Sequence, residues 1–199
     1  MTDTSYDRFL AAYQSDQPPP WDSGIVPPEV QAFAGQTTPG RALDVGCGTG
    51  VSSVFLAASG WQVTGVDWIE LALDQARERA EQAALPANQV VFLRADAGSR
   101  SFLPDHPPVS LWLDVGCLHS FPPEARQHYA QHAGRLVLPG GTLLLYAFAP
   151  YERDGEPRGL APEDVMALFT PAFGVVSVQH GQEITDPDKA SAWYRLRRA

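Results

Sequence analysis

The sequence contains little positive charge. Lysine and arginine together number 14 against 23 aspartates and glutamates, the formal net charge is −9, and Lys189 is the only lysine. Binding to a nucleic acid depends mainly on basic side chains that displace counterions from phosphates. The charge balance therefore disfavours a nucleic-acid partner and favours a small-molecule substrate.

Cysteines and long apolar runs are also scarce. Cys47 and Cys117 are the only cysteines, and neither has a second cysteine or a histidine at zinc-site spacing, so we expect two small buried thiols and no metal. No run approaches the roughly 20 apolar residues that cross a membrane. The N-terminus lacks the basic start and apolar middle of a signal peptide. These absences predict a cytoplasmic protein without a membrane partner. We expect it to be a monomer or a homodimer.

Short apolar strands alternate with helical patterns along most of the chain. We expect a helix near the N-terminus at 5–14 and others at 51–59, 70–84, 123–136 and 162–170. Strands are expected at 41–45, 62–66, 90–93, 109–113, 142–148, 175–178 and 192–196, the last two joined by a turn at 185–189. Such alternation predicts a parallel sheet covered on both faces.

The predicted fold is therefore an α/β, Rossmann-like, doubly wound sheet of seven strands, mostly parallel, with an antiparallel C-terminal strand. We expect a single domain over residues 1–199, in which 1–40 form an N-terminal appendage or lid and 41–199 form the core. Ligands of such sheets bind at the carboxyl ends of the strands. The functional site is expected there.

A glycine-rich loop, Gly46-Cys47-Gly48-Thr49-Gly50, follows the first strand. Glycines let the backbone turn tightly and lie against a ligand. The dinucleotide fingerprint needs a sixth-place glycine, where this chain has Val51. Asp44, just before the loop, would repel a pyrophosphate, whereas S-adenosylmethionine (SAM) has an ammonium group and no phosphate. The loop therefore favours SAM over NAD.

Acidic residues also follow the next three strands. Asp67 lies 21 positions beyond Gly46, where a carboxylate accepts hydrogen bonds from both ribose hydroxyls of NAD or of SAM. Asp96 and Asp114 follow the third and fourth strands. All three are expected at the ligand-binding edge of the sheet.

From about residue 41 to 199 the chain resembles the class I SAM-dependent methyltransferase family. Residues 20–24 and 113–122 resemble its small-molecule branch, which includes tellurite-resistance and thiopurine methyltransferases. The resemblance implies that Asp44 and the loop contact the methionine part of SAM, that Asp67 contacts the ribose, and that neighbouring residues pack on adenine or close over the cofactor. The expected cofactor-binding residues are Trp21, Asp44, Gly46, Cys47, Gly48, Gly50, Asp67, Trp68, Ile69, Asp96, Ala97 and Asp114.

The methyl acceptor must approach in line with the departing sulfur, so we expect it above the ends of the fourth and fifth strands. Residues 113–122 lack the D/N-P-P-Y/F motif of amino methyltransferases that act on adenine or glutamine. SAM already carries an activated leaving group, so positioning and desolvation supply most of the rate for a soft nucleophile. We predict methyl transfer to a small molecule, at sulfur, selenium or tellurium before oxygen or nitrogen.

Several roles stay open at this point. His119 is a candidate general base, or a side chain that only bonds the backbone. Phe121 and Tyr151 either line an acceptor pocket or are ordinary loop aromatics. His128 and His132 have the i, i+4 spacing of a metal pair, but without a third ligand we expect a solvated helix face. A SAM-binding regulatory module without turnover, or an RNA or protein methyltransferase, is the alternative function.

Overall fold

The computed structural model describes residues 5–86, 88–153, 156–182 and 189–199. The chain forms two compact units, Met1–Asp96 and Ala97–Ala199. Their strands belong to a mostly parallel seven-stranded sheet with antiparallel C-terminal strands. The predicted fold class is confirmed, and each unit is described by itself below.

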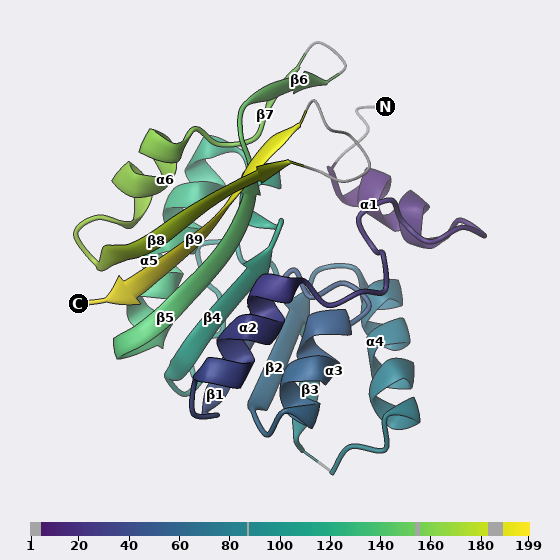
Figure 1. Cartoon of the computed structure of the whole chain (residues 1–199). Helices are drawn as coiled ribbons and strands as arrows, with labels where there is room; N and C mark the ends of the chain where they lie inside the picture. The colour runs from purple at the N-terminus through teal and green to yellow at the C-terminus, as the bar shows by residue number, and fades with distance from the viewer. Residues whose placement is uncertain (1–4, 87, 154–155, 183–188) are drawn as a thin grey trace. The chain divides into compact units, whose positions relative to one another are not determined.

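The first unit contains three parallel strands with helices beside them (Figure 1). β1 (Arg41–Val45), β2 (Gln62–Asp67) and β3 (Val90–Arg94) lie in the order β3-β2-β1. α3 (Val51–Ala58) follows β1, and α4 (Glu70–Gln82) follows β2. The strands and helices expected here are confirmed, apart from a slightly earlier end of α4.

Two helices precede β1. α1 (Ser5–Tyr13) matches the expected N-terminal helix, whereas α2 (Pro28–Gln36) was not predicted. Its first turn accommodates Pro28, because the first helical residues have no intrahelical acceptor for their N–H groups. Val30 and Phe33 are buried, and the Phe33 ring lies 5.9 Å from that of Trp61. This packing explains why a short helix with weak periodicity forms.

Phe92 of β3 fills space that two glycines leave empty. A Cβ at Gly65 would lie 2.6 Å from the Phe92 ring and 2.9 Å from the hydroxyl of Ser53. A Cβ at Gly50 would lie 2.9 Å from Ala76 and 3.0 Å from the same ring. Such distances are shorter than van der Waals contact allows, so the ring packs here only because both positions are glycine.

The second unit contains four long strands. β4 (Val109–Val115) pairs in parallel with β5 (Val137–Phe148), β5 pairs antiparallel with β9 (Ala190–Arg198), and β9 pairs antiparallel with β8 (Phe173–Gln182). β5 begins at Val137 rather than at residue 142, with Gly140 in a left-handed conformation. The turn expected between β8 and β9 lies mainly outside the described residues.

Shorter elements connect these strands. η1 (Leu118–Ser120) follows β4, and α5 (Pro123–Leu136) and α6 (Pro162–Phe169) match the expected helices. β6 (Tyr151–Arg153) and β7 (Glu156–Arg158) form an unpredicted two-stranded sheet after the end of β5 (Figure 1). Among the described residues, no helix has the length and apolar character that a membrane crossing requires.

Two expectations about single side chains are wrong. His132 does not belong to a solvated helix face: it is buried, and its Nε2 lies 2.8 Å from the carbonyl oxygen of Ser99, which attaches that loop to α5. Cys47 and Cys117 are half-buried rather than buried, because each follows a strand in a loop that lies at the edge of the apolar core.

Candidate cofactor and acceptor sites

The glycine loop after β1 is held by backbone hydrogen bonds from β2. The N–H groups of Gly46 and Cys47 both donate to the carbonyl oxygen of Val66, at 2.8 and 3.0 Å. Gly46, Gly48 and Gly50 have φ values of 69°, 53° and 75°, which side-chain-bearing residues rarely adopt. The loop conformation therefore requires glycine at the positions that the motif predicts.

Asp67, at the end of β2, connects directly to this loop. One oxygen of its carboxylate accepts a hydrogen bond from the N–H of Gly48 at 3.0 Å, and the other accepts one from the N–H of Ile69 at 2.9 Å. Burial raises the pKa of Asp67, while the surrounding backbone N–H groups oppose that rise. A carboxylate has about four lone-pair sites, so these bonds leave acceptor capacity for ribose hydroxyls.

Asp44 is buried directly before the loop. Its carboxylate accepts a hydrogen bond of 2.6 Å from the hydroxyl of Ser53 on α3, which was not predicted. Ser53 in turn has room for its hydroxyl because residue 65 is glycine. The arrangement places a negative group behind the loop, where it attracts an ammonium group.

The segment after α1 contacts the same loop. The hydroxyl of Tyr13 lies beside Gly48, 3.0 Å from where a Cβ would stand, and it accepts a hydrogen bond of 3.2 Å from Nε1 of Trp21. Thr49 donates its hydroxyl hydrogen to Asp22 at 2.5 Å and accepts a hydrogen bond from Arg79 of α4 at 3.2 Å. Sequence reasoning identified Trp21 but missed Tyr13, whose only signal was its place on the apolar side of α1.

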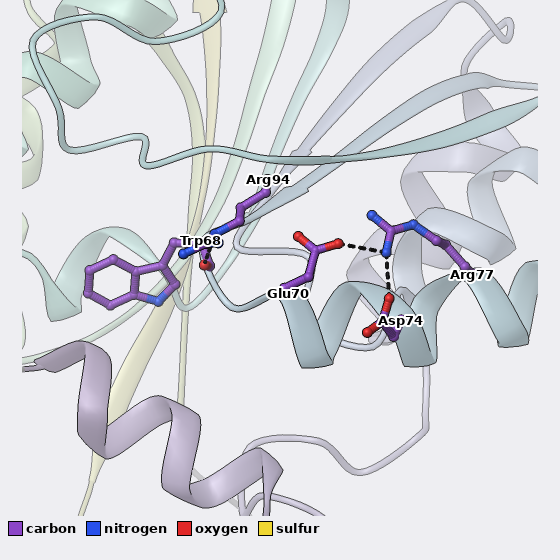
Figure 2. Close-up of polar contacts among 5 residues, drawn as sticks. All are labelled: Trp68, Glu70, Asp74, Arg77 and Arg94. Carbon is purple, nitrogen blue, oxygen red and sulfur yellow. Dashed lines mark hydrogen bonds and ion pairs between the residues drawn. The ribbon is translucent and has the colours of Figure 1, made fainter.

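Trp68 and Ile69, the residues expected to pack on adenine, also contact α1. Ile69 is fully buried in a cluster with Tyr13 and Ala72, and the Trp68 ring lies 5.7 Å from that of Tyr6. The carbonyl oxygen of Trp68 accepts a hydrogen bond of 3.1 Å from Nε of Arg94 (Figure 2). Both residues therefore have defined positions: Ile69 lies in this cluster and Trp68 packs against it, directly before α4.

Figure 2 also shows the start of α4, where Arg77 lies between two carboxylates. Its Nη1 is 2.9 Å from Glu70 and 2.7 Å from Asp74, and all three side chains are substantially exposed. Exposed ion pairs contribute little to stability. This group orders the surface of α4 and offers a control position for substitutions at Asp67.

The residues around the loop fit SAM. Two buried carboxylates, Asp44 and Asp67, lie next to the glycine loop. Tyr13 packs closely against Gly48, which has no side chain. A cofactor with an ammonium group, a ribose and no phosphate suits these carboxylates, whereas a pyrophosphate would be repelled by Asp44. Asp96 is exposed after β3 and Ala97 is buried, so their predicted contacts with adenine stay predictions.

In the second unit, Asp114 at the end of β4 is completely buried. Its carboxylate accepts hydrogen bonds from the N–H groups of Cys117 and Leu118, at 2.6 and 3.0 Å, and from the hydroxyl of Tyr129 at 2.6 Å. Tyr129 itself accepts a hydrogen bond of 2.6 Å from Trp112. Burial raises the pKa of Asp114 to about 6. These contacts give it a positioning role for the loop that carries His119.

His119 lies in η1, with its ring 4.7 Å from that of Phe148 at the end of β5. Burial first, and the charge of Arg126 second, lower its pKa to about 4. The ring is therefore neutral at pH 7 and a weaker base than an ordinary histidine. Its Nδ1 is buried and has no hydrogen-bond partner in the described part of the chain.

Fold and site together are those of an α/β domain with groups suited to a nucleoside cofactor at the ends of β1 and β2. A family model described as a methyltransferase domain matches residues 42–141. The chain is 32% identical over 177 residues to the probable thiol methyltransferase 2 of Arabidopsis thaliana, which covers 85% of this chain and 75% of that protein.

Two further likenesses extend the comparison. The chain is 29% identical over 155 residues to the 2-heptyl-1-hydroxyquinolin-4(1H)-one methyltransferase of Mycobacteroides abscessus, over 74% of this chain and 66% of that protein. Its fold matches the crystal structure of Burkholderia thailandensis 1,6-didemethyltoxoflavin-N1-methyltransferase with bound S-adenosylhomocysteine, with a TM-score of 0.79 and 20% identity, over 96% of this chain and 86% of that one.

The chain belongs to the SAM-dependent methyltransferase family. The family resemblance read from the sequence is confirmed, and so is SAM as the cofactor of that family. The individual contacts that each residue makes with SAM stay predictions.

Proposed function

We propose that this protein transfers the methyl group of SAM to a small-molecule acceptor, with sulfur, selenium or tellurium preferred over oxygen or nitrogen as the acceptor atom. SAM supplies a methyl group that is already activated by the sulfonium charge. The chain's own contribution is to bind the cofactor, to orient the acceptor and to exclude water. The likeness to a probable thiol methyltransferase supports this preference.

The apolar surroundings of His119, whose ring lies against Phe148 and whose Nδ1 is buried, are the observation that carries the proposal. With its pKa lowered to about 4, His119 is poorly suited to remove a proton from a hydroxyl or an ammonium group. A thiol has an ordinary pKa of about 8.5 and is partly ionised near neutral pH without help. Selenols and tellurols are more acidic still. An acceptor of this kind reacts without a strong base.

The cofactor contacts form part of the same proposal. Asp67 would accept the ribose hydroxyls, and Asp44 would attract the ammonium group of the methionine part. Trp68 and Ile69 would border the adenine, and Asp96 and Ala97 would meet its edge. Trp21 would close over the methionine end, supported by its hydrogen bond to Tyr13. Gly46, Cys47, Gly48 and Gly50 would contribute backbone, and Asp114 would act through the loop that it holds.

A set of acceptors with one ring and different nucleophilic atoms tests the preference. Release of S-adenosylhomocysteine is measured with thiophenol, phenol and aniline, and we expect kcat/KM to be at least tenfold higher for thiophenol. Equal or higher values for phenol or aniline would overturn the preference for soft atoms. SAM binding without turnover of any small acceptor would instead favour a regulatory module, and turnover only on RNA or protein would favour that alternative.

The variant His119→Gln tests the physical reason. General-base catalysis typically contributes a factor of about 10² to 10⁴. If no strong base is needed, we expect the rate with thiophenol to fall by less than about tenfold, well short of that range. A fall of 10² or more would show that His119 removes the proton, and the argument from its pKa would fail.

A further inference from the structure

Three buried nitrogen atoms of the second unit have no hydrogen-bond partner among the residues that the structure describes. They are Nδ1 of His119, Nε of Arg126 and Nε of Arg158. In the described part of the first unit, the indole nitrogen of Trp61 is also unpartnered. Buried donors are normally paired, and an unpaired guanidinium donor costs free energy. Two such donors in one region point to a ligand that accepts hydrogen bonds.

Arg126 connects these residues. Its Nη2 donates to the carbonyl oxygen of His119 at 3.3 Å and to that of Gly159 at 3.2 Å. Gly159 directly follows Arg158, so one guanidinium bridges η1 and the end of β7. The hydrogen bond to the backbone of His119 brings the charge of Arg126 close to that residue, and this charge contributes, after burial, to the lowered pKa of His119.

The same part of the second unit contains aromatic rings. Arg158 pairs with Tyr151 across the β6–β7 hairpin, which places their side chains on the same face of the ribbon. The Tyr151 ring is 5.8 Å from that of Phe148, which in turn contacts His119. The ammonium group of Lys189 lies 5.1 Å from the Tyr151 ring centroid and 5.8 Å from that of Phe148.

Positive charge is therefore concentrated in one place on an acidic chain. Lys189 lies over two rings, Arg158 pairs with Tyr151 across the hairpin, and Arg126 bonds Gly159 directly after Arg158, although the net charge of the protein is −9. Asp164 is the acid that acts on Arg126, and its effect on the pKa of that guanidinium is smaller than the opposing effect of burial. An anion would be attracted here even though the rest of the protein repels it.

We propose that this cluster binds a planar aromatic acceptor that bears a carboxylate or a comparable oxyanion. The oxyanion accepts hydrogen bonds from Nε of Arg126 and Nε of Arg158, because guanidinium groups are well suited to binding carboxylates. The ring of the acceptor packs against Phe148 and Tyr151. The inference rests on the proposed function, because it names the class of acceptor for that reaction.

Binding of benzoate, benzamide and cyclohexanecarboxylate, measured by calorimetry with S-adenosylhomocysteine present, separates charge from ring shape. Benzamide has the shape of benzoate without its charge, and cyclohexanecarboxylate has the charge without the flat ring. We expect benzoate to bind at least tenfold more tightly than either. Benzamide binding as tightly as benzoate, or no measurable benzoate binding at millimolar concentration, would overturn the proposal.

The variant Arg158→Gln tests the cation itself, with Arg100→Gln as the matched control. Arg100 is in the same unit, has an exposed side chain and makes only a 3.5 Å contact with Glu124, so its loss removes the same charge elsewhere. We expect Arg158→Gln to weaken benzoate about tenfold or more and benzamide by less than twofold. Equal effects of the two variants on benzoate would refute a direct contact.

A pH titration by NMR measures the pKa of His119 with and without benzoate. If the cluster has only a structural role, benzoate should leave this pKa unchanged. An anion beside Arg126 offsets the charge that lowers the pKa of His119, so benzoate should raise that pKa whereas benzamide should not. An unchanged pKa in saturating benzoate would place the ligand elsewhere. Because these experiments need no methyl transfer, they distinguish failure of this inference from failure of the proposed function.

Discussion

Asp114→Asn tests the buried carboxylate that positions the His119 loop. Burial raises the pKa of Asp114 from 3.8 to about 6, despite the opposing hydrogen bonds from Tyr129, Cys117 and Leu118. An acid whose pKa is higher in the folded state contributes stability below its unfolded pKa, and this contribution is lost as the pH rises through the folded pKa. At about 1.4 kcal/mol per pKa unit, the whole shift corresponds to about 3 kcal/mol, of which about 2.4 kcal/mol is lost between pH 4 and pH 7.

His119 acts in the opposite direction over nearly the same range. Its pKa is lowered from 6.5 to about 4, so its contribution to stability is present above 6.5 and is lost as the pH falls through 4. That change also corresponds to about 3 kcal/mol. The two effects nearly cancel in the unmodified protein, and only single variants reveal them.

Urea unfolding at pH 4, 5, 6 and 7 measures both effects. Relative to the unmodified protein, Asp114→Asn should gain about 2.4 kcal/mol in unfolding free energy from pH 4 to pH 7, on top of a pH-independent loss from its disturbed hydrogen bonds. His119→Gln should show the opposite trend, and the double variant should show neither. A difference between Asp114→Asn and the unmodified protein that stays constant within about 0.5 kcal/mol across this range would refute the shift, since that is the scatter of such comparisons.

Three further predictions concern the first unit. Asp67→Ala should weaken binding of S-adenosylhomocysteine, measured by calorimetry, by about 1–3 kcal/mol, because a charged hydrogen bond to ribose is lost. The exposed control Asp74→Ala should show no change. Equal affinities for both variants would contradict the role of Asp67. Gly50→Ala should lower the unfolding free energy by about 1–3 kcal/mol, since its φ is 75° and a Cβ would lie 2.9 Å from Ala76, and an unchanged melting temperature would rule this out. Thr49→Val removes the hydroxyl that bonds both Asp22 and Arg79, which should lower the unfolding free energy by about 1 kcal/mol. Limited proteolysis around Asp22 should become faster. An unaltered cleavage rate would show that the hydrogen bond does not hold that segment.

The regular part of the fold could be predicted because local patterns and tertiary structure agree there. β1 is a short apolar run that ends at the glycine loop, and α5 begins at Pro123, a residue suited to a first helical turn. The position of Asp67 at the end of β2 followed from the strand pattern alone, and the structure adds its bonds to Gly48 and Ile69. The sequence was informative wherever the residues that define an element or a site lie within a few positions of one another.

The rest depended on contacts between residues far apart in the sequence. α2 forms because Phe33 reaches Trp61, a contact that no local pattern around its prolines indicates. Arg126 reaches Gly159, 33 positions away, so its neighbourhood with Arg158 was not visible beforehand. His119 was recognised by residue type, but its lowered pKa follows from burial that only the folded chain supplies.

The ring of Phe92 ties three positions to one another. Because it occupies the space beside Gly50 and Gly65, an alanine at either glycine needs a smaller side chain at position 92. Among related sequences these positions should therefore vary together rather than singly. A variant with Phe92→Ala should tolerate Gly65→Ala better than the unmodified protein does. Phe92 on β3 therefore influences the space for the Ser53 hydroxyl that bonds Asp44 on β1, two strands away in the sheet.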